Sequence, residues 1–161
     1  MKKFFKALTC LTLALCLLAS SMLVSNPVSA AETTVSEETI QLDDGDYCVI
    51  TTTETVIPSI TRGKTKTKTA KKAYKYYNAN DVLSWEYDLY GTFMYDDYLV
   101  VCSDVVHEIT VNNFRNWICD EASRWKSGNT AYGKAVFRLL TTSAKKTVNL
   151  QISCTKHGVI S

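Results

Sequence analysis

The strongest constraint on the fold is a regular alternation of apolar and polar side chains between Leu83 and Phe93. Odd-numbered positions in this stretch are apolar or aromatic except for Gly91, and the positions between them are largely polar. Successive side chains of a β-strand point to opposite faces of its sheet. The alternation therefore predicts a long strand with one buried face and one solvent-facing face.

The same period of two recurs in several shorter segments, and turn-forming residues separate them. A Thr- and Val-rich segment, Tyr47–Ile57, ends at Pro58, which is a poor strand residue. Further alternation lies in Val105–Val111, Ala131–Leu139 and Val148–Cys154. About seven to nine short strands at such spacing are typical of an all-β, antiparallel two-sheet sandwich with immunoglobulin-like architecture. The side chains expected at its core are Trp85, Phe93, Phe137 and Leu150.

The segment from Arg62 to Tyr77 has two interpretations. As a strand it places Lys64, Lys66 and Lys68 on one face, with threonines between them on the other. As a helix it would group the later lysines against alanines and tyrosines. The Lys/Thr alternation favours the strand, and the helix remains the alternative.

The N-terminal residues have the order of a secretory signal peptide. Lys2, Lys3 and Lys6 precede an apolar run, Ala7–Val24, and a small-residue cleavage site ends at Ala30. We expect a signal peptide helix over residues 1–30, cleaved after Ala30, and a secreted or extracellular product that is held at the envelope, if at all, by binding alone. The alternative is an apolar run retained as an N-terminal membrane anchor. After cleavage we expect no transmembrane span.

The rest of the chain divides into a flexible acidic arm over residues 31–45 and a single β-sandwich domain over residues 46–161. The arm is polar, rich in Thr and Ser, and ends at the turn-forming sequence Asp43-Asp44-Gly45-Asp46. The residues that follow the leader are enough to build one compact core.

Charged residues are strongly segregated early in the mature chain. Residues 31–60 carry seven acids and no base, whereas residues 61–75 carry seven bases and no acid. A cationic strand beside tyrosines suits an anionic envelope polymer or a protein surface as partner. The alternative is a solvated face that only keeps the sheet soluble. The residues assigned to such a contact are Lys64, Lys66, Lys68, Lys72, Tyr74 and Tyr76. We expect no nucleic acid partner.

Four cysteines follow the leader, an even number that permits two disulfides in an exported chain. We expect Cys102 to pair with Cys154, because that bond would join the start of one strand to the end of the last. A second pair, Cys48 with Cys119, follows by elimination. Free buried thiols are the alternative if the chain is exported into a setting without an oxidant.

The chain offers few residues for catalysis, and we assign no catalytic residue. His107 and His157 are the imidazoles available after the leader. His107 falls on an apolar strand face, and the spacing of Cys154 and His157 suits a thiol nucleophile and its base poorly. The run from Asp43 to Asp46 lacks the ligand spacing of a calcium loop. We therefore expect no metal and no cofactor.

Three segments connect the chain to known sequences: Leu89–Tyr95, Trp125–Gly133 and Ile152–Gly158. Through them, residues 64–161 resemble small exported proteins of Gram-positive bacteria, most of which are uncharacterised. The resemblance implies a β-sandwich. Similar proteins often pair a cysteine after the Gly-Thr-Phe strand with one near the C-terminus, as Cys102 and Cys154 would. The resemblance implies no catalytic residue and offers no counterpart for Cys119.

These features predict a noncatalytic exported module that binds a cell-envelope polymer, a surface or a protein partner. The alternative is a small secreted hydrolase that uses carboxylates such as Glu86, Asp88 or Glu108, or an effector that acts on membranes. Paired carboxylates in a cleft would favour the enzyme. Exposed flat faces among the nine tyrosines and three tryptophans would favour a binding surface, because such faces stack on sugar rings.

Overall fold

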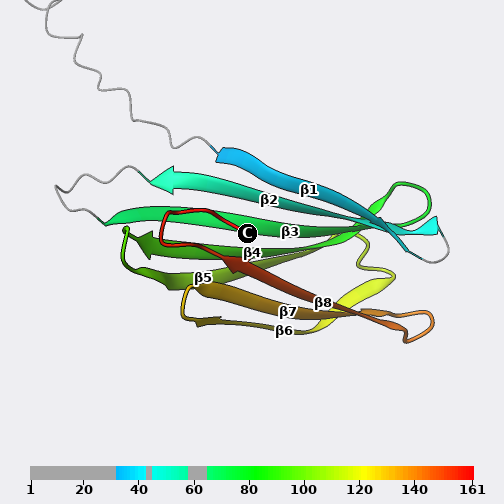
Figure 1. The fold of residues 1–161 in the computed structure, drawn as a ribbon. Helices are drawn as coiled ribbons and strands as arrows, with labels where there is room; N and C mark the ends of the chain where they lie inside the picture. Colours follow the sequence, from blue (N-terminus) through cyan, green and yellow to red (C-terminus); the bar gives the residue numbers. More distant parts are fainter. Residues whose placement is uncertain (1–31, 43–44, 58–64) are drawn as a thin grey trace, which may run out of the picture.

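Two antiparallel β-sheets packed face to face make up the described part of the protein (Figure 1). The computed structural model describes residues 32–42, 45–57 and 65–161, and these residues contain no helix. The strands within these ranges are β1 (Glu32–Gln41), β2 (Tyr47–Ile57), β3 (Lys66–Tyr77), β4 (Leu83–Tyr95), β5 (Val100–Val111), β6 (Trp117–Ser127), β7 (Thr130–Leu139) and β8 (Lys145–Ser153). The expected signal peptide, residues 1–30, lies outside the described residues.

Each sheet is a meander, in which successive strands are also neighbours. The larger sheet contains β1 to β5 in sequence order, and the smaller sheet contains β6, β7 and β8 in sequence order. Every pairing between neighbouring strands is antiparallel. The expected all-β, two-sheet sandwich is confirmed.

The segment for which strand and helix were both considered is a strand in its described part. Lys66–Tyr77 forms β3, which pairs with β2 on one side and β4 on the other. Arg62 and Lys64 lie outside the described residues. Because β8 of the smaller sheet packs against β3, one face of β3 points into the space between the two sheets.

The acidic arm is a strand over most of its length, which corrects the expectation of a flexible segment. Glu32–Gln41 forms β1 and pairs with β2, from Glu32 opposite Thr55 to Gln41 opposite Tyr47. All ten side chains of β1 are exposed, so no apolar alternation marks it in the sequence. Backbone hydrogen bonds to β2 hold this strand, and those bonds require no apolar side chain.

The core lies between the sheets and is built around Trp85, which is fully buried. Its ring stacks on Phe137 of the opposite sheet at 3.9 Å between centroids and on Tyr76 at 4.8 Å. Trp117 meets Trp85 edge-on at 6.0 Å. Aromatic pairs in these arrangements stabilise a core beyond the area that they bury. The expected core residues Trp85, Phe93, Phe137 and Leu150 are all buried.

Two glycines allow the sheets to approach each other at the centre of the sandwich. A Cβ atom on Gly133 of β7 would lie 2.9 Å from Leu89 Cδ1 of β4, and the Tyr87 hydroxyl would be nearer still. A Cβ atom on Gly91 of β4 would lie 3.0 Å from the Cβ of Ala131 on β7. A side chain at either position would push the sheets apart, because protein interiors leave no spare volume.

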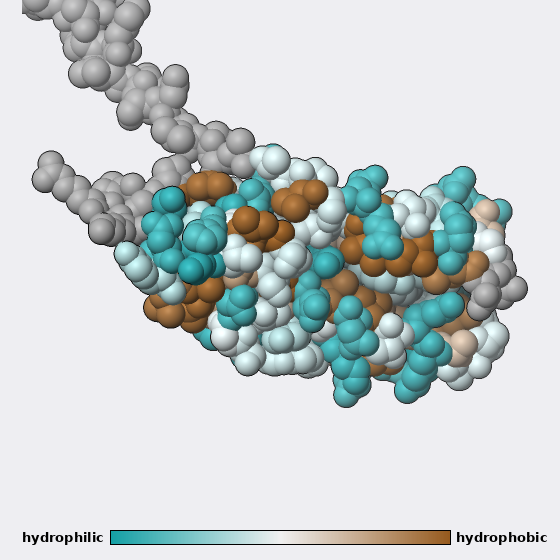
Figure 2. Space-filling view, in the orientation of Figure 1, coloured by the Kyte–Doolittle hydropathy of each residue, from teal (hydrophilic) through white to brown (hydrophobic). Residues whose placement is uncertain are grey.

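The smaller sheet covers only part of the larger one. Contacts between the sheets join β3, β4 and β5 to β7 and β8, and β5 also contacts β6, whereas β1 lies at the far margin. Figure 2 shows hydrophilic and hydrophobic side chains interleaved on the face in view, rather than one continuous apolar face.

Candidate functional site

The lysine at the centre of the predicted polyanion contact is buried. Lys68 is 7% exposed, and its ammonium donates hydrogen bonds to Glu54 Oε2 at 2.9 Å and to the Gly158 carbonyl at 2.7 Å. A lysine held in this way ties the C-terminal segment to β2 and β3. It is not available to a polymer in solvent, which corrects the sequence-based assignment.

The other members of that contact do not form one exposed surface either. Tyr76 is buried, stacks on Trp85, and donates its hydroxyl proton to Asp46. Tyr74 is half-buried, and burial raises its pKa. Lys72 reaches the backbone carbonyl of Gln151 on the opposite sheet at 3.4 Å. Among these residues Lys66 is exposed, and Lys64 lies outside the described residues. The physical reason is that the smaller sheet packs on the face of β3 that carries Lys68 and Tyr76, so alternate side chains of β3 point towards it.

The carboxylates considered for hydrolysis do come together, on the outer face of the larger sheet. Asp88 Oδ2 lies 2.7 Å from the Lys71 ammonium, and Glu86 Oε1 lies 3.8 Å from Lys71 and 3.7 Å from Lys75. The Tyr90 hydroxyl donates to Glu108 at 3.1 Å. Burial, and then the nearby Asp88 charge, raise the pKa of Glu86.

In this network the lysines neutralise the carboxylates. Asp88 is buried, and its Oδ1 atom has no hydrogen-bond partner, whereas its Oδ2 atom is paired with Lys71. A general acid and base must both reach a substrate held between them. Here the charges face each other across neighbouring strands of a single sheet face, an arrangement that stabilises the sheet as a charge network.

The four described cysteines are free thiols, so neither expected disulfide is formed in the structure. Cys102 and Cys154 are buried in the same core, where burial raises the pKa of both. Their thiols donate to the backbone carbonyls of Asp104 at 3.3 Å and Thr155 at 3.4 Å. Each sulfur thus has a local partner. Cys48 on β2 is also buried, and Cys119 on β6 is half-buried.

The two histidines occupy separate environments. His107 is half-buried, with its Nδ1 atom 3.3 Å from the Tyr87 hydroxyl, and burial followed by the Arg124 charge lowers its pKa. His157 is exposed and lies 3.8 Å from Asp97. Within the described residues, no group of three or more His, Cys, Asp and Glu side chains could hold a metal ion. Asp46 of the considered calcium loop instead accepts hydrogen bonds from Tyr76 and the Ala79 amide.

A pair of aromatic side chains, absent from the sequence-based assignment, lies on the outer face of the smaller sheet. Trp125 of β6 stacks on Tyr132 of β7 with ring centroids 5.3 Å apart and an interplanar angle of 6°. Trp125 is 48% exposed, although tryptophan is a large aromatic side chain. We call Trp125 and Tyr132 the aromatic platform.

Polar side chains surround the aromatic platform. Gln151 of β8 lies directly opposite Tyr132, and Lys134 and Asn149 form the next cross-strand pair on the same face. Gln151 and Asn149 are exposed and Lys134 is partly exposed. Together they offer amide and ammonium groups beside a flat ring, the combination that binds a ligand with an apolar face and hydroxyl groups at its edge.

The sequence did contain a signal for this pair. Gly128 adopts φ +57° in the turn that joins β6 and β7, and Ser127 pairs with Thr130 across it. Residues at equal distances from a two-residue turn must lie opposite each other on one face. Trp125 and Tyr132 satisfy that condition.

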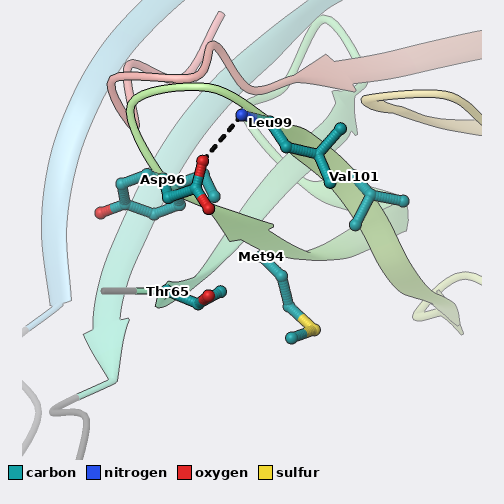
Figure 3. A pocket seen from close by; sticks show the side chains of 6 residues that line it. Thr65, Met94, Asp96, Leu99 and Val101 are labelled. Carbon is teal, nitrogen blue, oxygen red and sulfur yellow. Dashed lines mark hydrogen bonds between the residues drawn. The ribbon is translucent and has the colours of Figure 1, made fainter. Parts of the chain in front are cut away.

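A small open pocket lies at the opposite face of the molecule, beside the turn between β4 and β5 (Figure 3). Its volume is about 180 Å³, and its lining consists of Thr65, Met94, Tyr95, Asp96, Leu99 and Val101. Pockets for small molecules usually have volumes of about 300–1,000 Å³. This one has room for a single side chain rather than for a cofactor.

The comparisons with known proteins do not assign the chain to a family. No protein-family model matches the chain, no curated protein matches it, and no solved structure matches it. In residues 32–42, 45–57 and 65–161, no helix is both long enough and apolar enough to cross a membrane.

Proposed function

We propose that the chain is an exported, noncatalytic module that binds a cell-envelope polymer of sugar rings through the aromatic platform. The observation that carries this proposal is the half-exposed indole of Trp125, held parallel to Tyr132. A flat aromatic ring that is open to solvent and fixed in orientation is suited to stacking on a ligand. Tyr132 covers one face of the indole and fixes its orientation, which leaves the remaining surface for a ligand.

The chemistry of the surrounding side chains supports a sugar. One face of a pyranose ring carries mainly C–H groups and packs on an aromatic ring, whereas its hydroxyls require hydrogen-bond partners. Gln151, Asn149 and Lys134 supply donors and acceptors on the same face as the platform. The ligand would therefore lie across β6, β7 and β8.

We favour binding over hydrolysis because two of the three carboxylates considered for catalysis are already paired with lysines. Lys71 and Lys75 already neutralise Glu86 and Asp88, and His107 is engaged with Tyr87. The platform lies on the smaller sheet, away from these groups, and it carries no pair of carboxylates flanking the rings.

The experiment is a pull-down of the purified protein with insoluble envelope polysaccharide. We expect W125A to bind at least about tenfold more weakly than wild type, because truncation removes the stacking surface. Y132A should also weaken binding, since it removes the ring that orients Trp125. The matched control is F114A, which truncates an aromatic side chain that is 71% exposed outside the platform.

Salt separates this proposal from a polyanion contact. Stacking and neutral hydrogen bonds should persist in high salt, whereas an interaction between lysines and a polyanion weakens as counterions screen it. Equal binding by W125A and wild type, or binding abolished by salt alone, would contradict the proposal.

A further inference from the structure

The outer face of the smaller sheet differs in charge between the two sides of the aromatic platform. Towards the turn between β6 and β7, the next cross-strand row carries hydroxyl side chains, which are Ser127, Thr130 and Ser153. In the opposite direction along β7, the next row contains Lys134 and, directly opposite it on β8, Asn149. A ligand on the platform therefore meets neutral hydroxyls on one side and an ammonium group on the other.

Lys134 differs from the other lysines of the smaller sheet, each of which has a partner. Lys126 donates a hydrogen bond to a backbone carbonyl of β5, and Lys145 lies 3.5 Å from Asp120. Lys146 lies over an aromatic ring of the core. The Lys134 ammonium has no hydrogen bond, ion pair or ring contact with any of the residues that the structure describes. Its charge is therefore free for a ligand.

The carboxylate nearest to Lys134 in the strand register does not neutralise it. Glu121 of β6 lies one row further from the platform, opposite Val136. Among the described residues, Glu121 forms no ion pair with Lys134. A cation without a counter-ion attracts an anionic group of a ligand, and here that group would lie beside an aromatic surface.

Lys134 and Asn149 are suited to bind one carboxylate together. Side chains that stand directly opposite each other in an antiparallel pair have Cβ atoms about 4.5–5.5 Å apart. The ammonium and the amide N–H groups both donate hydrogen bonds, and an ionised carboxylate has two acceptor oxygens. One oxygen can therefore accept from each side chain. Hydrogen bonds with an ionised partner are stronger than neutral ones.

We propose that the aromatic platform selects sugar residues that carry a carboxylate, with the ring on Trp125 and Tyr132 and the carboxylate on Lys134 and Asn149. This inference rests on the proposed function and names the class of sugar bound. The carboxylate of a uronic acid is bonded directly to a ring carbon, so it lies at the edge of the ring. Neighbouring side chains on one face of a strand are about 7 Å apart, which places Lys134 beside a ring that rests on Tyr132.

A phosphate monoester fits this site less well than a carboxylate does. It carries about 1.5 to 2 negative charges at neutral pH. Within the described residues, the two rows that flank the platform contain no base besides Lys134. One ammonium balances one carboxylate, whereas it balances only part of the charge of a phosphate monoester.

Isothermal titration calorimetry of the purified protein tests the proposal with two matched oligosaccharides. One is a hexamer of galacturonic acid, and the other is the same hexamer with every carboxyl group methyl-esterified, which keeps the ring and removes the charge. Wild type should bind the acid about fivefold more tightly than the ester at low salt, the size expected for an exposed ion pair. K134Q should bind the two equally. W125A should weaken the binding of both about tenfold.

The matched control for charge is K145Q, which removes a lysine of the same face that is already paired with Asp120. It should keep the wild-type preference for the acid. Raising the salt concentration from about 0.05 M to about 1 M should abolish the preference in wild type and leave binding of the ester unchanged. Circular dichroism spectra identical to wild type would show that the variants remain folded.

Equal affinities of wild type for the acid and the ester would overturn this inference and leave the proposed function intact. A preference that K134Q retains, or that K145Q loses, would also overturn it. Displacement of the acid hexamer by phosphomannan at a lower concentration than by polygalacturonate would assign the site to a phosphate instead. Absence of binding to both hexamers, in a protein that still binds envelope polysaccharide, would exclude uronic acids. Loss of polysaccharide binding as well would refute the proposed function itself.

Discussion

Lys68 shows how one side chain can hold three segments together. Its ammonium bonds to Glu54 on β2 and to the Gly158 carbonyl near the C-terminus, from a position on β3. Hydrogen bonds that involve a charged group contribute more than neutral ones, and a partner left unsatisfied adds a penalty. Lys68 therefore holds the C-terminal segment against the larger sheet, although the sequence alone predicted that this lysine is exposed.

Replacing this lysine should be costly for folding. We expect K68A to lower the free energy of unfolding by about 2–3 kcal/mol, because Glu54 and the Gly158 carbonyl lose their shared donor. Urea denaturation followed by tryptophan fluorescence measures the change. K66A is the matched control on the same strand, where an exposed lysine should contribute less than about 0.5 kcal/mol. Equal effects of the two substitutions would show that Lys68 is not a structural tie.

His107 links stability to pH. Burial and then Arg124 lower its pKa below the ordinary value of 6.5, so the unfolded chain binds a proton on this ring more readily than the folded protein does. Its contribution to stability is present at high pH and is lost as pH falls below about 6.5. We expect H107Q to lose fewer degrees of melting temperature than wild type between about pH 8 and pH 5.

The control for this titration is the other histidine. H157Q alters an exposed ring beside Asp97, so its melting curve should follow wild type across the same pH range. Parallel losses in H107Q and wild type would mean that the His107 imidazole does not titrate against folding.

At the level of strands, β4 and β7 pack so closely that Gly133 of β7 has no room for a side chain. Replacing glycine by alanine in an open strand gains about 0.5–1 kcal/mol of stability. At Gly133 the new methyl group would clash with Leu89 and Tyr87, and inserting volume into a packed core costs about 1–3 kcal/mol. We expect the clash to dominate, so G133A should be destabilised in urea denaturation. S123A, on the exposed face of β6, should be unchanged, and a stabilised G133A would show that the sheets can separate without cost.

Some strands can be predicted from the hydrophobic pattern of the sequence, and others cannot. Alternation identified β4, most of β5, β7 and β8, because each of these strands has one face that is more buried than the other. It could not identify β1, whose ten side chains are all exposed and which is held mainly by backbone hydrogen bonds to β2. Hydrophobic pattern reports burial of side chains, and β1 buries none.

The same limit explains why the assigned contact residues were misplaced. The pattern of β3 shows which lysines share a face but not which face the second sheet covers. The smaller sheet packs on the face that carries Lys68 and Tyr76, so these side chains point inward. The aromatic platform could have been predicted, because the Ser127-Gly128-Asn129 turn fixes Trp125 opposite Tyr132. The packing of one sheet on the other depends on long-range contacts, whereas hairpin register is local.

The smaller sheet covers β3, β4 and β5 of the larger sheet, whereas β1 lies at an uncovered margin. We expect the free energy needed to open a segment to be higher in the covered strands than at this margin. β4 lies between β3 and β5 and beneath the smaller sheet, whereas β1 pairs with β2 alone and exposes every side chain. Segments with few buried contacts open at lower free energy than the core does.

In hydrogen–deuterium exchange we expect the amides of β1 to exchange first and those of β4 and β7 to exchange last. The T39P substitution, which introduces a residue that fits strands poorly, should speed exchange in β1 and leave β4 unchanged. Protection of β1 equal to that of β4 would mean that the larger sheet opens as one unit, with β1 as an integral part of it.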